Sequence, residues 1–128
     1  MLLGVLVVVV VIGAALRERR MTALTALTTN RRRLGPDGVV IGGEGFALER
    51  EGAPAVLLIH GAGDTPQTLR YLGAYLRQTG YHVAAPLLLG HGRSVRDFKQ
   101  VHADDLTRAA RAAYTDLRDR HSWTAVIG

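Results

Sequence analysis

Cysteine is absent from this 128-residue chain. Without thiols the chain has no disulfide bonds, no thiolate metal ligands and no cysteine nucleophile. Three of its histidines, His82, His102 and His121, show no spacing typical of a metal site. We therefore predict neither a bound metal nor a cofactor.

Aromatic side chains are scarce, at 5% of the residues, and the formal charge of +5 is confined to one short segment. From residue 34 to 128 the basic and acidic side chains balance. The excess lies in the N-terminal segment, which combines one acid, Glu18, with Arg17, Arg19, Arg20, Arg31, Arg32 and Arg33. Binding of single-stranded nucleic acid needs a basic face with aromatic residues, so we expect no nucleic-acid partner for residues 34–128.

The first sixteen residues, Met1 to Leu16, carry no charged side chain and are rich in leucine, valine and isoleucine. As a helix they span roughly 24 Å, somewhat less than the ~30 Å hydrocarbon core of a bilayer. We expect a transmembrane or signal-anchor helix, with residues 17–37 as an Arg-rich juxtamembrane linker. Because arginines follow the apolar run and none precede it, the rest of the chain is expected to face the cytoplasm. A cleaved signal peptide and a buried helix of a soluble domain are the alternatives.

Residues 38–128 predict a single α/β domain. Short apolar runs bounded by glycine or proline alternate with helical patterns, which favours a parallel sheet with crossover helices. The predicted parallel strands are Ala55 to Ile59, Tyr81 to Ala85 and Trp123 to Ile127. Glycines separate two further runs, so an N-terminal hairpin is expected from Val39 to Ile41 and Phe46 to Leu48.

Two amphipathic helices are expected between the parallel strands. The first has Asp64 or Thr65 as its N-cap and Pro66 in its opening turn, and it ends at Gly80. The second begins near Ala103 and carries two arginines in its last turn, where they stabilise the helix dipole.

The first parallel strand is followed by His60, Gly61, Ala62 and Gly63. Loops at the carboxyl ends of strands form the ligand sites of open α/β sheets. Glycines there permit backbone angles that other residues avoid, so we expect that the amides of Ala62 and its neighbours can turn toward a shared point, as an oxyanion requires. The alternative is an ordinary glycine-rich turn with a structural histidine.

A second loop with functional residue types leaves the carboxyl end of the next predicted strand. It contains Gly90, His91, Gly92, Arg93 and Ser94, and we predict that the two loops converge. His91 and Ser94 are three positions apart in one loop and lack a third orienting group. A pocket-rim or structural role is therefore favoured over a pair of base and nucleophile.

Together these motifs resemble the N-terminal half of α/β-hydrolases, in the carboxylesterase and monoacylglycerol-lipase branch. The resemblance covers roughly Val39 to Gly128 and rests on VLLIHGAGDTPQTLRYLGAYLRQTGYHVAAPLLLGHGRS, a following helix and TAVIG. It implies an incomplete α/β-hydrolase sheet. It also implies that Ala62 supplies an oxyanion-hole amide and that the loop around this amide is shaped by His60, Gly61 and Gly63.

In that family the nucleophilic serine lies in a G-x-S-x-G motif after the fifth strand. Gly128 would be the first glycine of this motif, so the serine, the acid and the histidine would lie beyond these 128 residues. The resemblance thus implies the N-terminal fragment of a membrane-anchored serine hydrolase of carboxylic or lipid esters, inactive as given. The alternatives are a non-catalytic, membrane-tethered α/β module that binds a ligand or partner, and nucleic-acid binding through the N-terminal arginines.

Overall fold

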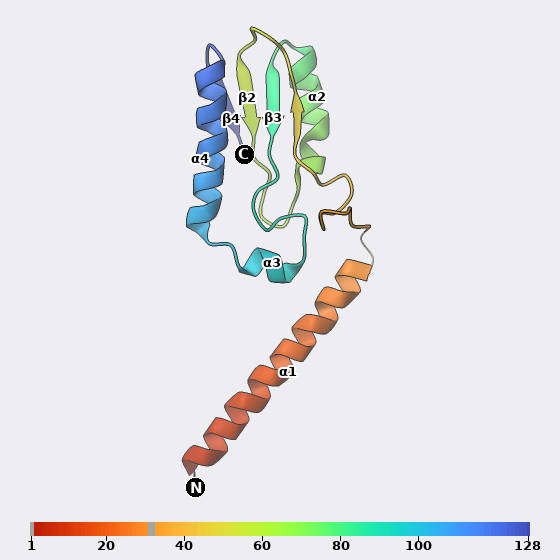
Figure 1. The fold of residues 1–128 in the computed structure, drawn as a ribbon, viewed down its shortest axis with the longest axis vertical. Coiled ribbons are helices and arrows are strands. Elements are labelled where there is room, and N and C mark those ends of the chain that lie inside the picture. Colours follow the sequence, from red (N-terminus) through yellow and green to blue (C-terminus); the bar gives the residue numbers. More distant parts are fainter. Residues whose placement is uncertain (1, 31–32) are drawn as a thin grey trace. The chain divides into compact units, whose positions relative to one another are not determined.

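The computed structural model describes residues 2–30 and 33–128, and within the first helix it describes the side chains of residues 10–23 and 26. The chain divides into two compact units, Met1–Arg33 and Leu34–Gly128. We call them unit 1 and unit 2. The described part of unit 1 contains one helix, and unit 2 contains the sheet (Figure 1).

Unit 1 consists of α1, which runs over Leu2–Asn30. The helix continues through most of the segment predicted as a linker, because alanine and leucine are strong helix formers and neither glycine nor proline occurs between Gly13 and Gly35. In the part of the chain that the structure describes, no helix is long and apolar enough to cross a bilayer. Met1 and the side chains of residues 2–9, which make up over half of the predicted anchor, lie outside the described residues.

Unit 2 is built on a four-stranded sheet with the order β1-β3-β2-β4. Its strands are β1 (Phe46–Leu48), β2 (Ala55–Leu58), β3 (His82–Ala85) and β4 (Thr124–Ile127). β2 pairs in parallel with both β3 and β4, while β1 pairs antiparallel with β3. The predicted parallel part of the α/β fold is therefore confirmed, and each of its strands is one residue shorter than predicted.

Helices cover both faces of this sheet (Figure 1). On one face lies α2 (Arg70–Gln78), preceded by the 3-10 turn η1 (Pro66–Leu69), and on the other lies α4 (Ala103–Arg120). The side chains of β2 alternate between the two cores. Val56 and Leu58 pack on the α2 side, whereas Ala55 and Leu57 pack with Leu117 of α4. Because both faces of β2 are buried, its sequence is continuously apolar.

The predicted hairpin between residues 39–41 and β1 is wrong. β1 pairs with β3 instead, where the side chain of Phe46 joins the apolar core on the α2 side. Val40 forms an isolated bridge with Leu34, and its N–H donates to the carbonyl oxygen of Gly92 at 2.8 Å. The start of unit 2 is thus bonded to the loop that follows β3.

Candidate functional site

The two glycine-containing loops meet at the carboxyl ends of β2 and β3, as predicted. His60 follows β2 and is 4% exposed. Its Nε2 atom accepts a hydrogen bond from the N–H of Leu88, in the loop after β3, at 3.0 Å. The side chain of one loop therefore binds the backbone of the other.

The hydrogen bonds of His60 define which ring nitrogen carries its proton. Because Nε2 accepts a hydrogen bond, it carries a lone pair and no proton. The proton of the neutral ring is therefore on Nδ1. Nδ1 lies 3.1 Å from the carbonyl oxygen of Gly61 and donates to it. The imidazole thus uses both nitrogens to hold the backbone on either side of the site, which makes it a positioning residue.

Burial lowers the pKa of His60 below its ordinary value of 6.5. The hydrogen bond to Gly61 opposes this shift in part, and the nearby imidazole of His91 adds to it. A protonated Nε2 could not accept the Leu88 N–H, so the geometry and the pKa direction both favour the neutral ring.

His91 lies against His60, which sequence reasoning did not predict. It is 4% exposed, and its ring stands edge-on to the rings of His60 and Phe98, with centroids 4.8 Å from each. Nδ1 lies 3.0 Å from the carbonyl oxygen of Leu89 and donates to it. Nε2 is buried and has no hydrogen-bond partner among the described residues. His91 therefore lies inside the junction of the two loops, beneath the surface.

The loop from Gly61 to Asp64 forms a turn in which the Asp64 N–H donates to the Gly61 carbonyl at 3.2 Å. Gly63 has φ +76°, which favours glycine, whereas Gly61 does not lie in the left-handed region. Ala62 is exposed. Its N–H takes part in none of the hydrogen bonds found within residues 33–128, so it is available to an acceptor from outside.

Ser94 is the N-cap of α3 (Val95–Lys99), a short helix that we did not predict. Its hydroxyl donates to Asp97 Oδ2 at 2.7 Å and accepts from the Asp97 N–H at 3.2 Å. The Ser94 N–H also donates to Asp97 Oδ2, at 3.1 Å, and this bond forms a capping box with the one from the Asp97 N–H. The two hydrogen bonds that Asp97 Oδ2 accepts, from the hydroxyl and the N–H of Ser94, lower the pKa of Asp97. The S-x-x-D spacing was a signal that could have located this helix. Within the described residues no hydrogen bond joins Ser94 to His91.

The end of β4 lies beside the end of β2. The Ile59 N–H donates to the carbonyl oxygen of Ile127 at 2.8 Å. A Cβ built on Gly128 would lie 3.3 Å from Cβ of Ile59. Gly128 is therefore next to the residue that precedes His60, at the same edge of the sheet as the two loops.

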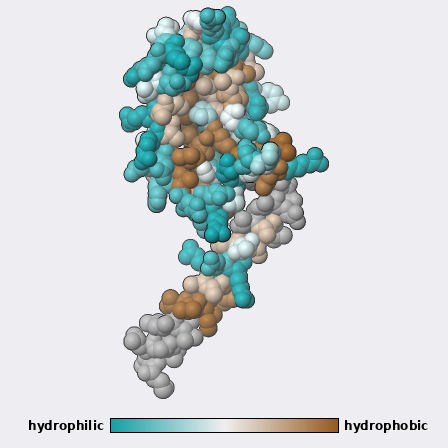
Figure 2. Space-filling view, in the orientation of Figure 1, coloured by the Kyte–Doolittle hydropathy of each residue, from teal (hydrophilic) through white to brown (hydrophobic). Residues whose placement is uncertain are grey.

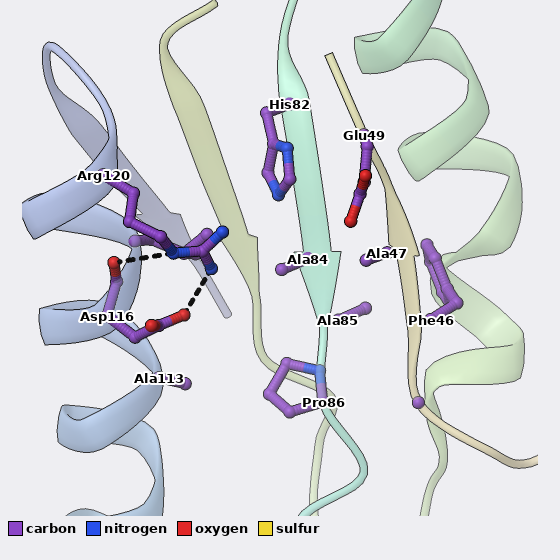
Figure 3. Close-up of a pocket in the computed structure, with 12 residues that line it drawn as sticks. Phe46, Ala47, Glu49, His82, Ala84, Ala85, Pro86, Ala113, Asp116 and Arg120 are labelled. Carbon is purple, nitrogen blue, oxygen red and sulfur yellow. Dashed lines mark hydrogen bonds and ion pairs between the residues drawn. The ribbon is translucent and has the colours of Figure 1, made fainter. Parts of the chain in front are cut away.

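Two shallow grooves flank α4, away from the loop junction. One, of about 340 Å³, runs between β1, β3 and α4; Figure 3 shows the ion pair of Arg120 and Asp116 on one wall, with His82 and Glu49 across from it. The other, of about 390 Å³, is lined by residues of α4, Val126 and Ile59. Neither groove is lined by His60, Ala62 or His91. In the described part of the chain no three acidic or histidine side chains gather to hold a metal ion.

A mostly parallel sheet with helices on both faces and a glycine-rich loop at the carboxyl end of an inner strand defines an α/β protein with its site at that edge. Comparison with known proteins shows which family of α/β proteins the chain is similar to. No protein-family model matches the chain. It is 33% identical over 90 residues to the thermostable monoacylglycerol lipase of Bacillus sp. (strain H-257), a match that covers 70% of this chain and 36% of that protein.

The fold is similar to a solved structure from the work on LipS and LipT, two metagenome-derived lipolytic enzymes. The TM-score is 0.63 and the sequence identity 29%, over 73% of this chain and 36% of the solved one. The chain belongs to the α/β-hydrolases of the esterase- and lipase-like branch. It spans about a third of the length of these relatives.

Replacing His60 tests its positioning role. His60→Gln keeps an acceptor near the position of Nε2, so we expect it to retain most of the free energy of unfolding. His60→Leu leaves the buried Leu88 N–H without a partner, which costs about 1–3 kcal/mol. Urea unfolding at pH 7.5 measures the difference. Equal stability of the two variants would contradict the assigned hydrogen bond.

The lowered pKa of His60 predicts a pH dependence of stability. Below the ordinary value of 6.5 the unfolded chain binds a proton that the folded state does not, so the free energy of unfolding falls as the pH falls through this window. Burial also lowers the pKa of His82, which adds to the fall. In His60→Gln the fall just below pH 6.5 should be shallower. Urea unfolding across this pH range measures it, and an unchanged slope would argue against the neutral ring.

Proposed function

We propose that this chain forms the oxyanion-binding part of a serine hydrolase that cleaves carboxylic esters, with lipid esters among its substrates. The observation that carries the proposal is the N–H of the exposed residue Ala62, in the loop after β2, which has no hydrogen-bond partner within residues 33–128. The names of the two relatives, a monoacylglycerol lipase and a lipolytic enzyme, support the substrate class.

The position of Gly128 supports the same chemistry. In the family that the chain resembles, the G-x-S-x-G turn follows the strand that corresponds to β4. A turn that starts at Gly128 would begin beside Ile59, two positions before Gly61. The two serines within the 128 residues are less suited to act as the nucleophile. Ser94 caps α3, and Ser122 precedes β4, at the opposite end of that strand.

The proposed reaction needs one negative charge to be stabilised. A serine oxygen attacks the ester carbonyl carbon, and the carbonyl oxygen becomes an oxyanion that accepts a hydrogen bond from the Ala62 N–H. The oxyanion then collapses, the alcohol leaves with a proton, and water hydrolyses the acyl-enzyme in the same way. We propose that residues beyond Gly128 supply the serine, the acid and the histidine, and that residues 1–128 alone do not hydrolyse esters.

The proposed amide role is tested in the product of the reading frame extended past Gly128. Ala62→Pro removes the N–H, so we expect the kcat for a short-chain ester to fall by about 10²- to 10³-fold. Ala62→Ser keeps the N–H and is the matched control, with activity near that of the parent.

Labelling by a fluorophosphonate separates this proposal from a non-catalytic binding module. The extended product should be labelled, and residues 1–128 alone should not. An extended product that stays unlabelled, or an Ala62→Pro variant with full activity, would contradict the proposal.

We also propose that Met1 to Leu16 attaches the protein to a membrane, with unit 2 on the cytoplasmic side. The uncharged apolar sequence and the arginines that follow it support this location. Deletion of residues 2–16 should move the protein from the membrane fraction to the supernatant after alkaline carbonate extraction. A full-length chain that carbonate already releases would contradict the attachment.

A further inference from the structure

Two histidines lie in contact at the amino ends of the strands, at the end of the sheet opposite the candidate site. His82 is the first residue of β3 and is 4% exposed, and His121 is the C-cap of α4. Their ring centroids lie 4.4 Å apart, with an angle of 42° between the ring planes. We call these two residues the histidine pair. Neither ring belongs to the junction of the two site loops.

Both imidazoles bind the backbone of residues 50–53, a segment between β1 and β2 that we call the β1–β2 turn. The Arg50 N–H donates to Nδ1 of His82 at 3.4 Å, and Nδ1 of His121 donates to the carbonyl oxygen of Ala53 at 2.8 Å. Within the turn, the Ala53 N–H donates to the carbonyl oxygen of Arg50 at 3.4 Å. The histidine pair therefore makes two of the three hydrogen bonds that the structure describes for the backbone of this turn.

The two rings carry their protons on opposite nitrogens. His82 accepts at Nδ1, so its proton is on Nε2, whereas His121 donates from Nδ1 and has its lone pair on Nε2. The Nε2 atom of His121 is buried and has no hydrogen-bond partner among the described residues. A second proton on His82 would occupy the atom that accepts the Arg50 N–H. A second proton on His121 would place a donor without an acceptor in a buried position, which is unfavourable.

Charged side chains of both signs act on the histidine pair, and they come from β1 or the residue after it, from α2 and from α4. They are Glu49, Arg77, Asp116 and Arg120. Figure 3 shows His82 between Glu49 and Arg120, which is ion-paired with Asp116. The guanidinium of Arg50, on the turn itself, donates to the carbonyl oxygen of Arg77.

These surroundings favour the neutral form of His82. Burial lowers its pKa below the ordinary value of 6.5, and the ring of His121 and the two arginines add to this shift. Glu49 opposes the shift in part. The direction agrees with the hydrogen bond, because only an unprotonated Nδ1 accepts the Arg50 N–H.

We propose that the histidine pair is a pH-sensitive clamp, which holds the β1–β2 turn at neutral pH and releases it in mild acid. A proton on His82 removes the bond to Arg50, and a proton on His121 becomes stable only when the ring reaches water. Hydrophilic residues dominate the surface at this end of unit 2 (Figure 2, top), so a released turn enters solvent. This inference does not depend on the proposed function.

The release is expected to be local. β1 pairs with β3 over Phe46 to Leu48, and the Arg77 guanidinium donates to the carbonyl oxygen of Glu49 at 2.9 Å. Neither interaction involves an imidazole, so β1 should remain in the sheet when the turn is released.

The absence of cysteine allows a site-specific test in the full chain. Glu51→Cys, in the exposed part of the turn, and Tyr71→Cys, on α2 and 91% exposed, each accept a single nitroxide spin label. From pH 7.5 to 5.5 the label at position 51 should become more mobile, and the label at position 71 should not change. Below pH 6.5 the released fraction should rise by up to about tenfold per pH unit, because the released His82 binds a proton that the clamped one does not. An unchanged spectrum at position 51, or an equal change at both positions, overturns the proposal.

Asparagine variants test whether the histidine pair causes this response. Asparagine places its amide group near the position of Nδ1 and does not titrate, so His82→Asn with His121→Asn retains groups for both bonds to the turn. In this double variant the label at position 51 should stay equally immobile at pH 7.5 and 5.5. His102→Asn, at the exposed N-cap of α4, is the matched control and should respond like the parent. A response that persists in the double variant contradicts the clamp, and so does one that is lost in His102→Asn.

Nitrogen-15 NMR of the unsubstituted full chain tests the clamp even if the double variant does not fold. At pH 7.5 the proton should be on Nε2 of His82 and on Nδ1 of His121. Relative to its intrinsic rate, the Arg50 amide hydrogen should exchange faster at pH 5.5 than at pH 7.5, while the amide hydrogens of β2 remain protected. The same tautomer in both rings, or equal acceleration in Arg50 and β2, overturns the proposal.

Discussion

A single buried hydrogen bond, from the Leu88 N–H to Nε2 of His60, joins the two loops of the site. The donor is a backbone group in a region that water does not reach, so it needs a partner within the protein. Because the same ring donates to the Gly61 carbonyl, the start of the loop that carries Ala62 is held relative to the loop after β3. The loop that carries Ala62 and the buried imidazole of His60 are thus two parts of one arrangement.

The sheet brings that arrangement to one edge. β2 is parallel to both of its neighbours, so the residues that follow β2, β3 and β4 all leave on the same side. The residues after β2 and β3 form the loop junction, and Gly128 after β4 lies next to Ile59. The first residues of unit 2 are bonded to the same edge through Val40 and Gly92, so the chain enters unit 2 close to its candidate site.

Sequence patterns predicted the local features well and the remote pairings poorly. The three parallel strands and α4 were found because continuous apolar runs and a periodic apolar face are local signals. The hairpin prediction failed because the partner of β1 is β3, which is over thirty residues away. The short helix α3 was missed although Ser94 and Asp97 provide a capping box. The contact of His91 with His60 has no local signal, since it depends on how two loops fold onto each other.

The sequence alone determined the class of the fold, the loops that hold the candidate site and the resemblance to α/β-hydrolases, because apolar periodicity, glycine positions and short motifs depend on neighbouring residues. The tertiary structure decided which polar groups in those loops form hydrogen bonds within the chain and which do not. His60 and Ala62 are two positions apart, yet the side chain of His60 is hydrogen-bonded to a loop 28 residues away, whereas Ala62 is exposed and its N–H has no partner within residues 33–128. Only packing between distant segments could make that distinction, since burial and hydrogen-bond partners are set by what the rest of the chain brings close.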